Sequence, residues 1–153
     1  MLAATVVAPG HSKAVPLSPE FIVKQDGAEK QDCERNAVKR WHDKHGARLK
    51  PLRPVYLADD LFACQSVVER LLDNGDDFIF TCKDTSHRAL YDFIDGAEPE
   101  RHVETIRKGK AVETRRYRWI TGVPLRDGKD AVLVNWIGFD PRIKSGDWTP
   151  RAP

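Results

Sequence analysis

Apolar positions along the chain follow two periods, which predict helices and strands in the first hundred residues and strands alone afterwards. Residues 4–8 and 14–17 are short apolar stretches separated by Pro9-Gly10, so two extended segments are expected at the start. A polar helix is expected next, from about residue 27 to residue 44, with Gly46 as its stop. Its narrow apolar stripe consists of Cys33, Ala37, Val38 and Trp41.

The middle of the chain predicts a strand–helix–strand–helix unit. Val55–Ala58 is an apolar run typical of a buried parallel strand, residues 61–74 keep helical spacing, and Asp77–Cys82 is a second strand. Gly75 is expected to end the first of these helices. Thr85 or Ser86 is expected to cap the start of the second helix, and Gly96 to end it. Short connections between such elements predict a right-handed βαβ unit and a parallel sheet, hence an α/β fold class.

From His102 onward the period is two, which predicts antiparallel strands. Residues 102–107 and 111–120 flank a short turn and read as a hairpin, and Asp127-Gly128 is a second hairpin signal before residues 131–137. The expected organisation is an α/β part, an antiparallel β part and a poorly ordered tail, over residues 1–100, 101–140 and 141–153.

Length and composition fit one globular domain. The chain has 153 residues, of which 41% are hydrophobic, and it contains no run of roughly 18 apolar residues, so an integral membrane protein is not expected. Cys33, Cys64 and Cys82 form no CxxC pair, which disfavours a disulfide scaffold or a zinc ribbon and predicts a reduced, cytoplasmic protein.

A formal net charge of +2 averages over three blocks of opposite sign. Residues 39–53 carry six basic residues against one acid, residues 56–98 carry three against ten, and residues 101–118 carry seven against two. The basic blocks could hold a polyanion while the acidic block holds a divalent cation, or all three could be ordinary solvated faces.

Asp59-Asp60 is the strongest single feature, because it follows an apolar strand. Sites in open α/β sheets lie at the carboxyl ends of strands, and carboxylates there can bind magnesium. The alternative is that one of the two acids caps the following helix.

A basic and aromatic stretch lies on the predicted hairpin. Alternation puts Arg116 and Arg118 on one face of the strand, and Arg115, Tyr117 and Trp119 on the other. Arginines bind phosphates and aromatic rings stack on unpaired bases, although a half-buried structural strand would look the same. His42 and His45 have loose metal-ligand spacing on a helix among basic residues, so a metal site is not expected there.

Several blocks together resemble the DDE transposases of the insertion-sequence-four class, which have a ribonuclease-H-like catalytic core. The matching blocks, in order over about residues 2–140, are residues 24–34, 39–41, 55–62, 77–83 and the stretch 117–136. The ordered set is more specific than any one block. The resemblance implies that residues 1–100 form a partial ribonuclease-H-like core with a parallel or mixed sheet, and that residues 101–140 form an antiparallel insertion.

The resemblance also implies chemistry. Such enzymes hold two Mg²⁺ ions on three carboxylates and displace phosphodiester bonds in DNA. Asp59 matches the family's second Asp, and Asp60 is the alternative; the first Asp and the final Glu have no matching position. We therefore expect an internal fragment that is inactive alone, with Asp59 and Asp60 as candidate metal ligands and transposon-end DNA as partner. A homodimer is a possible state of the intact enzyme.

Two other functions are compatible with the residues. The chain could be a non-catalytic nucleic-acid-binding module that uses Arg115, Arg116, Arg118, Tyr117 and Trp119 together with Lys39 and Arg40 of the first basic block. It could also be a small nuclease or phosphatase with Asp32 or Glu34 as an additional ligand, although nothing in the spacing brings these acids to Asp59 and Asp60.

Overall fold

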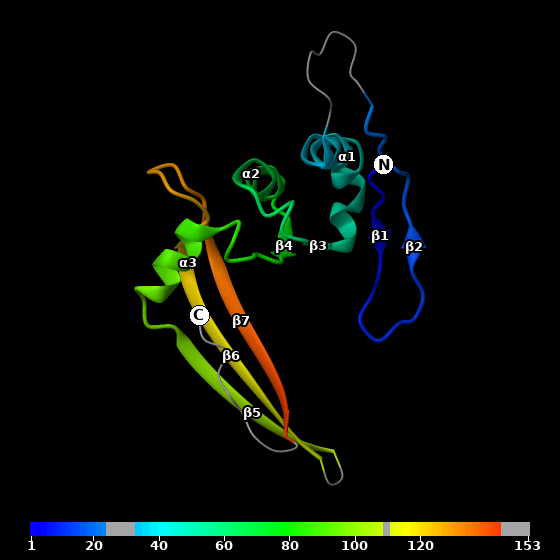
Figure 1. Cartoon of the computed structure of the whole chain (residues 1–153). Coiled ribbons are helices and arrows are strands. Elements are labelled where there is room, and N and C mark those ends of the chain that lie inside the picture. The colour runs from blue at the N-terminus through cyan, green and yellow to red at the C-terminus, as the bar shows by residue number, and fades with distance from the viewer. Residues whose placement is uncertain (24–32, 109–110, 145–153) are drawn as a thin grey trace. The chain divides into compact units, whose positions relative to one another are not determined.

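A computed structural model of the chain describes residues 1–23, 33–108 and 111–144 (Figure 1). It is a mixed α/β structure with two compact units, Met1–Ser86 and His87–Pro153. The predicted domain boundaries at residues 100 and 140 are not tested by this division and stay predictions. None of the helices in the described part of the chain is long and apolar enough to cross a membrane.

The first unit begins with a small antiparallel pair, β1 (Thr5–Val6) and β2 (Val15–Pro16). An isolated bridge between Leu2 and Glu20 extends this pairing. The Trp41 indole Nε1 donates a 2.8 Å hydrogen bond to the Ser18 carbonyl oxygen. This bond fixes the end of the N-terminal segment on the following helix.

Helix α1 (Glu34–Leu49) is followed by the 3₁₀ turn η1 (Lys50–Leu52). The predicted start near residue 27 lies outside the described residues, and the predicted stop at Gly46 is wrong, because the helix continues to Leu49. Gly46 is buried inside the helix, where a Cβ atom would lie 2.8 Å from the His42 Nε2 atom. The glycine therefore makes room for the imidazole ring instead of ending the helix.

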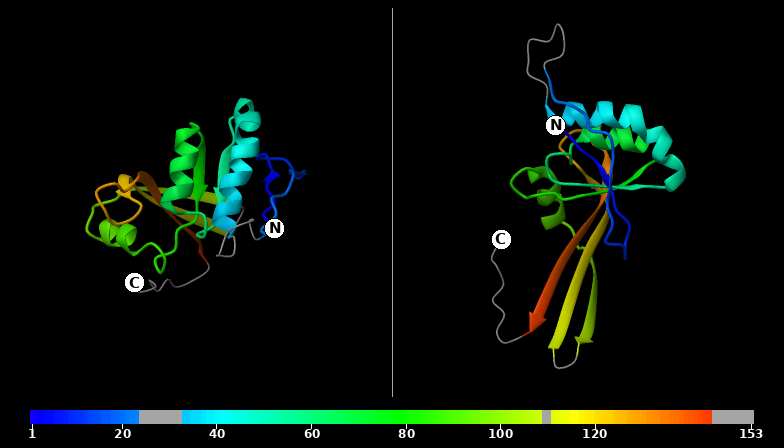
Figure 2. Two further views of the ribbon diagram at one scale, coloured as in Figure 1. Left: turned by 90° about the horizontal axis from the view of Figure 1, so that it is seen from above. Right: turned by 90° about the vertical axis from the view of Figure 1, so that its right-hand side faces the viewer.

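The predicted strand–helix–strand unit is confirmed. β3 (Val55–Ala58) pairs in parallel with β4 (Asp77–Phe80), and α2 (Gln65–Asp73) connects them. Alternate residues of both strands are half-buried, and the opposite positions, including Leu57 and Ile79, are exposed. The two views in Figure 2 show α1 and α2 side by side. The core of this unit lies around them, at Ala37, Trp41, Ala63, Val67, Val68 and Leu71.

The second unit combines α3 (Arg88–Asp95) with a three-stranded antiparallel sheet in the order β5–β6–β7. These strands are β5 (Glu100–Lys108), β6 (Ala111–Pro124) and β7 (Leu133–Lys144). Helix α3 contacts β6, and among the described side chains of this unit the buried ones are Leu90, Ile94, Val123 and Leu125. The antiparallel prediction is confirmed, and β7 continues to Lys144, seven residues past the end of the strand predicted over residues 131–137.

The predicted cap of α3 is wrong. The residue before the helix is His87, and neither Thr85 nor Ser86 begins it. The Ser86 hydroxyl instead donates to the Asp60 carboxylate.

Candidate nucleic-acid interface

Strand β6 sorts its side chains onto two faces of the sheet. The register places Arg118 directly opposite Arg101 on β5 and Gly138 on β7, and places Arg116 opposite Val103 and Asp140. Directly opposite residues of an antiparallel sheet share a face. Arg101, Arg116 and Arg118 therefore lie on one side, which we name the arginine face.

Two arginines of this face, Arg101 and Arg118, stand directly opposite each other near the start of β5. Arg101 and Arg118 are exposed, and neither forms an ion pair with a residue that the structure describes. The Arg118 guanidinium carbon lies 5.5 Å from the centroid of the Trp136 ring, which is a cation–π contact. Like charges directly opposite each other destabilise a sheet. A bound anion would relieve that repulsion.

Arg116 has a different setting on the same face. It lies opposite Asp140 in the register, and both residues have interaction partners. Among the described residues, positive charge on this side of the sheet without an ion-pair partner therefore lies at Arg101 and Arg118, and also at Arg107, which is exposed opposite Val112.

The opposite face carries aromatic and apolar side chains. The Tyr117 ring stacks on Phe139 at 5.1 Å, and the His102 ring lies 6.1 Å from Tyr117. Trp119 is half-buried between its register partners Glu100 and Ile137. Phe139 and Ile137 are more than half exposed. The aromatic side chains of β6 thus pack within their own sheet.

Arg115 is also held on this second face. Its Nε atom donates a 2.7 Å hydrogen bond to Glu113 Oε1, and that bond raises the pKa of the Arg115 guanidinium. Of the three arginines that the sequence places on β6, Arg115 is therefore compensated by an acid on its own strand, whereas Arg118 is not.

The basic block on α1 lies in the other unit, and its charges are partly used within it. Arg40 Nε donates to Glu20 Oε1 at 2.9 Å, and Lys44 Nζ donates to Glu20 Oε2 at 2.7 Å. These two hydrogen bonds lower the pKa of the Glu20 carboxyl group, and Glu20 is buried. Arg40 thus anchors the N-terminal segment, while Lys39 is half-buried beside a cavity.

Asp59 and Asp60 have separate roles at the end of β3. The Asp60 carboxylate accepts hydrogen bonds from the Ser86 hydroxyl at 2.6–2.7 Å and from the Lys83 backbone N–H at 2.7 Å. Asp59 is exposed, and its Oδ1 accepts a 3.1 Å bond from the Leu61 backbone N–H. Neither acid caps α2, because that helix begins at Gln65 after Cys64.

The acids of the described residues do not form a metal cluster. No group of three or more His, Cys, Asp or Glu side chains that could hold a metal ion occurs within residues 1–23, 33–108 and 111–144. Glu34 begins α1 and is exposed, and Asp32 lies outside the described residues.

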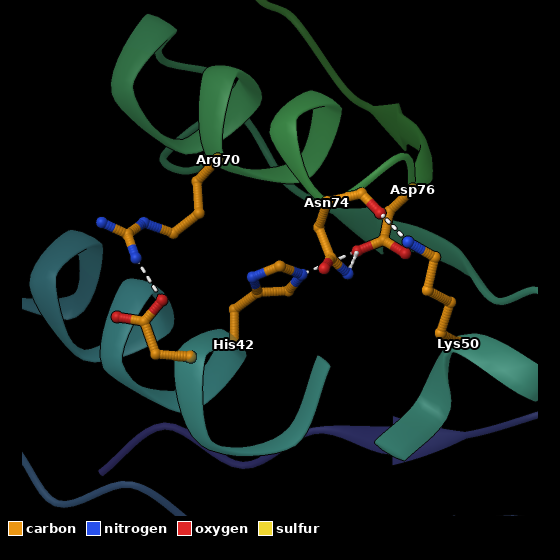
Figure 3. Close-up of polar contacts among 6 residues, drawn as sticks. His42, Lys50, Arg70, Asn74 and Asp76 are labelled. Atoms are coloured by element: carbon orange, nitrogen blue, oxygen red, sulfur yellow. Dashed lines mark hydrogen bonds and ion pairs between the residues drawn. The ribbon is translucent and has the colours of Figure 1, made fainter. Parts of the chain in front are cut away.

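A buried histidine–aspartate pair was missed by sequence reasoning. His42 Nε2 lies 2.7 Å from Asp76 Oδ2, and both side chains are less than a tenth exposed (Figure 3). Asn74 Nδ2 donates to the same oxygen at 2.8 Å, and Lys50 Nζ donates to the Asn74 carbonyl oxygen at 2.7 Å. His45 lies against Trp41 instead, with 5.1 Å between ring centroids. His42 therefore ties α1 to the start of β4.

A cavity of about 300 Å³ lies within the first unit. Tyr56 lines it, and the Tyr56 hydroxyl is buried and makes no hydrogen bond with any described residue. Burial, and then the nearby Asp76 carboxylate, raise the pKa of Tyr56 to about 12. The other lining residues are Leu2, Ala3, Ala4, Val38, Lys39, Trp41, His42, Leu57, Ala58, Asp59, Phe62, Val67, Arg70, Leu71 and Phe80.

Comparison of the chain with known proteins finds no relative. No family model, curated protein or solved structure matches the chain.

Proposed function

We propose that this chain binds DNA through the arginine face of its second unit, as part of a DDE transposase of the insertion-sequence-four class. The pair Arg101–Arg118 carries the proposal. These guanidinium groups are exposed, directly opposite each other and without an ion-pair partner among the described residues. A phosphodiester backbone supplies the anions that such a pair needs, and guanidinium groups bind phosphates in a bidentate manner.

The contact with Trp136 supports this assignment. The indole ring lies beside the Arg118 guanidinium and restricts where that side chain can point. An arginine with fewer accessible conformations loses less entropy when it binds a phosphate. Phosphate contacts of this kind position a protein on DNA without reading its sequence, so we expect binding that depends on salt and hardly on base sequence.

The first unit fits the same family assignment. Its parallel pair, joined by α2, agrees with part of a ribonuclease-H-like sheet, and Asp59 stands exposed where the resemblance expects a catalytic carboxylate. Asp60 is a weaker candidate, since its oxygens accept bonds from Ser86 and Lys83.

These residues do not fit a magnesium site on their own. A two-metal site needs several converging carboxylates, and within residues 1–23, 33–108 and 111–144 no group of three or more acidic, histidine or cysteine side chains converges beside Asp59. The same observation argues against a self-contained nuclease or phosphatase. We therefore propose that the chain binds DNA without needing Mg²⁺ and does not cut it alone.

Fluorescence anisotropy with a labelled duplex tests this proposal. At low salt the double variant Arg101→Gln/Arg118→Gln should bind about tenfold or more weakly than the wild-type chain, because two phosphate contacts are lost. The matched control is Arg126→Gln, which removes an exposed charge that pairs with Asp130 outside the arginine face. EDTA and Asp59→Ala should leave the affinity unchanged. An equal loss in the control variant, or no binding by the wild type, would refute the proposal.

A further inference from the structure

We propose that His42 and Asp76 form a proton-transfer site that hydrolyses small, uncharged esters in the groove between α1 and α2. Asp76 orients the His42 ring, and His42 takes a proton from the attacking water. The site belongs to the first unit and does not rest on the proposed DNA binding. That binding gives no role to this buried histidine–aspartate pair.

The hydrogen bonds of the pair assign the ring proton of His42 to one nitrogen. His42 Nε2 lies 2.7 Å from Asp76 Oδ2, and Asn74 donates to the same oxygen at 2.8 Å. Since that carboxylate accepts both bonds, the proton of the neutral imidazole lies on Nε2, and Nδ1 keeps its lone pair. A carboxylate in this position also stabilises the positive ring that forms when Nδ1 takes up a proton.

The second ring nitrogen of His42 is accessible. His42 Nδ1 has no hydrogen-bond partner among the described residues, and within that part of the chain the Tyr56 hydroxyl is the only side-chain polar atom that is both buried and without a partner. His42 Nδ1 therefore keeps accessible surface, although the whole side chain is only 7% exposed. Figure 3 shows this nitrogen on the side of the ring that faces Arg70. His42 and Arg70 both line the groove between the two helices.

The groove has room for a small substrate and carries cations beside His42. Its volume is about 590 Å³, which is within the range of ligand sites in proteins. Lys39 lines it and has no ion-pair partner among the described residues, and Arg70 pairs with Asp43 across it. Positive groups of this kind stabilise the oxyanion that forms when water attacks an ester carbonyl.

The acids of the groove act against a negatively charged substrate. Asp43, Glu69 and Asp73 line it, three acids against the two cations, and all three are exposed. A carboxylate or phosphate on the substrate would be repelled by this excess of negative charge. The groove therefore favours an uncharged ester.

The proposed reaction returns every proton to its starting place. His42 Nδ1 removes a proton from water while the water oxygen forms a bond to the carbonyl carbon. The tetrahedral intermediate then breaks the bond between that carbon and the alcohol oxygen, and the proton on Nδ1 passes to this oxygen. The products are a carboxylic acid and an alcohol, and His42 is neutral again.

Methyl 4-acetoxybenzoate and 4-acetoxybenzoate are matched probes, because both carry an acetyl ester and only the second is an anion. Release of the phenol from each would be measured with the full chain and with the same concentration of free imidazole. With the methyl ester we expect the chain to be about 100-fold faster than imidazole, the contribution typical of a positioned general base. With the anion we expect a smaller factor.

Two substitutions assign the reaction to the pair. His42→Gln should lower the rate with the methyl ester to nearly that of free imidazole. Asp76→Asn should lower kcat about tenfold or more with little change in KM, because the amide group donates to Nε2 and leaves the proton on Nδ1. His102→Gln removes an exposed histidine of the second unit and is the control, with kcat unchanged.

Nitrogen-15 NMR of the histidine rings tests the same site in the wild-type chain, whether or not the variants fold. At about pH 8 the His42 proton should be on Nε2 and not on Nδ1. The proposal fails if that proton is on Nδ1, or if the chain is no faster than free imidazole, as for a pair that only joins α1 to β4. It also fails if His42→Gln is as fast as the wild type, or if the anionic ester is preferred.

Discussion

Individual buried polar side chains affect the stability that we expect of the first unit. His42 and Asp76 bond to each other, with Asn74 donating to the same carboxylate, so their burial is compensated. Tyr56 packs edge-on against His42 at 5.5 Å between ring centroids, yet its hydroxyl has no described partner. We therefore expect the His42–Asp76 hydrogen bond to stabilise the first unit. We expect the buried Tyr56 hydroxyl, which has no described partner, to lower the stability of that unit.

Alkaline pH tests the setting of Tyr56. Its pKa is raised to about 12 in the folded chain, against 10.0 for the free side chain. The unfolded chain therefore loses this proton first, and stability that is fully present below pH 10 is lost as the pH rises toward 12. Thermal unfolding between pH 9 and pH 12 should show a smaller decline for Tyr56→Phe than for the wild type. Identical declines would contradict the assignment.

At the scale of elements, the packing of the His42 ring against Gly46 explains why α1 does not end at that glycine. Gly46 is buried under the His42 imidazole, and its backbone stays helical. A sequence pattern cannot show this, since the same glycine near lysine and histidine is typical of a helix end. The ring of His42 is held in place by Asp76, which is 34 residues away along the chain.

The substitution Gly46→Ala tests this packing, because the expected change in the free energy of unfolding has the opposite sign to that in an ordinary helix. In an ordinary helix interior, Gly→Ala stabilises by roughly 1 kcal/mol. Here we expect Gly46→Ala to destabilise by about 1–2 kcal/mol, because its Cβ would collide with the imidazole. In a His42→Ala background the same substitution should become stabilising. Urea denaturation of the four proteins measures this cycle, and a stabilising Gly46→Ala in the wild type would contradict it.

The N-terminal segment is attached to α1 by Glu20, which makes its docking sensitive to acid. Bonds from Lys44 and then Arg40 hold the pKa of Glu20 below its ordinary value of 4.5. A carboxyl group with a lowered folded pKa stabilises above its unfolded pKa, and this contribution is lost as the pH falls through the folded value. Thermal unfolding from pH 7 to pH 3 should therefore decline less in Glu20→Gln, which begins less stable. Glu98→Gln, at an exposed position, is the control and should decline as the wild type does.

The elements that could be predicted from sequence are those with strong periodicity. Val55–Ala58, the helix after it and the antiparallel strands from residue 100 onward have clear apolar spacing, and their local preference agrees with their packing. Contacts between distant polar residues could not be predicted in this way. Examples are the bond from Ser86 to Asp60, which replaces the expected helix cap, and the histidine–aspartate pair.

The candidate site was predictable only in part, for a related reason. Alternation along β6 separates Arg116 and Arg118 from Arg115, but it cannot show which arginine has an acidic neighbour. The importance of Arg101 comes from the register between β5 and β6, which places it opposite Arg118. Register of this kind depends on the whole sheet and not on any single strand.

At the scale of the whole molecule, we expect the chain to bind DNA and not to cut it. Asp59 is exposed at the end of β3 without a cluster of acids among the described residues. We expect no nicking of supercoiled plasmid above background with Mg²⁺ or Mn²⁺, and equal results for the wild type and Asp59→Asn. Cleavage that depends on Asp59 would show that this chain assembles a catalytic site by itself.

The salt dependence of DNA binding tests the central claim most directly. Each phosphate contact contributes about 0.9 to the slope of log K against log salt concentration. We expect Arg101→Gln/Arg118→Gln to lower the magnitude of this slope by about 2 relative to the wild type, and Arg126→Gln to leave it unchanged. An unchanged slope in the double variant, at any affinity, would contradict the proposal that these two arginines bind phosphates.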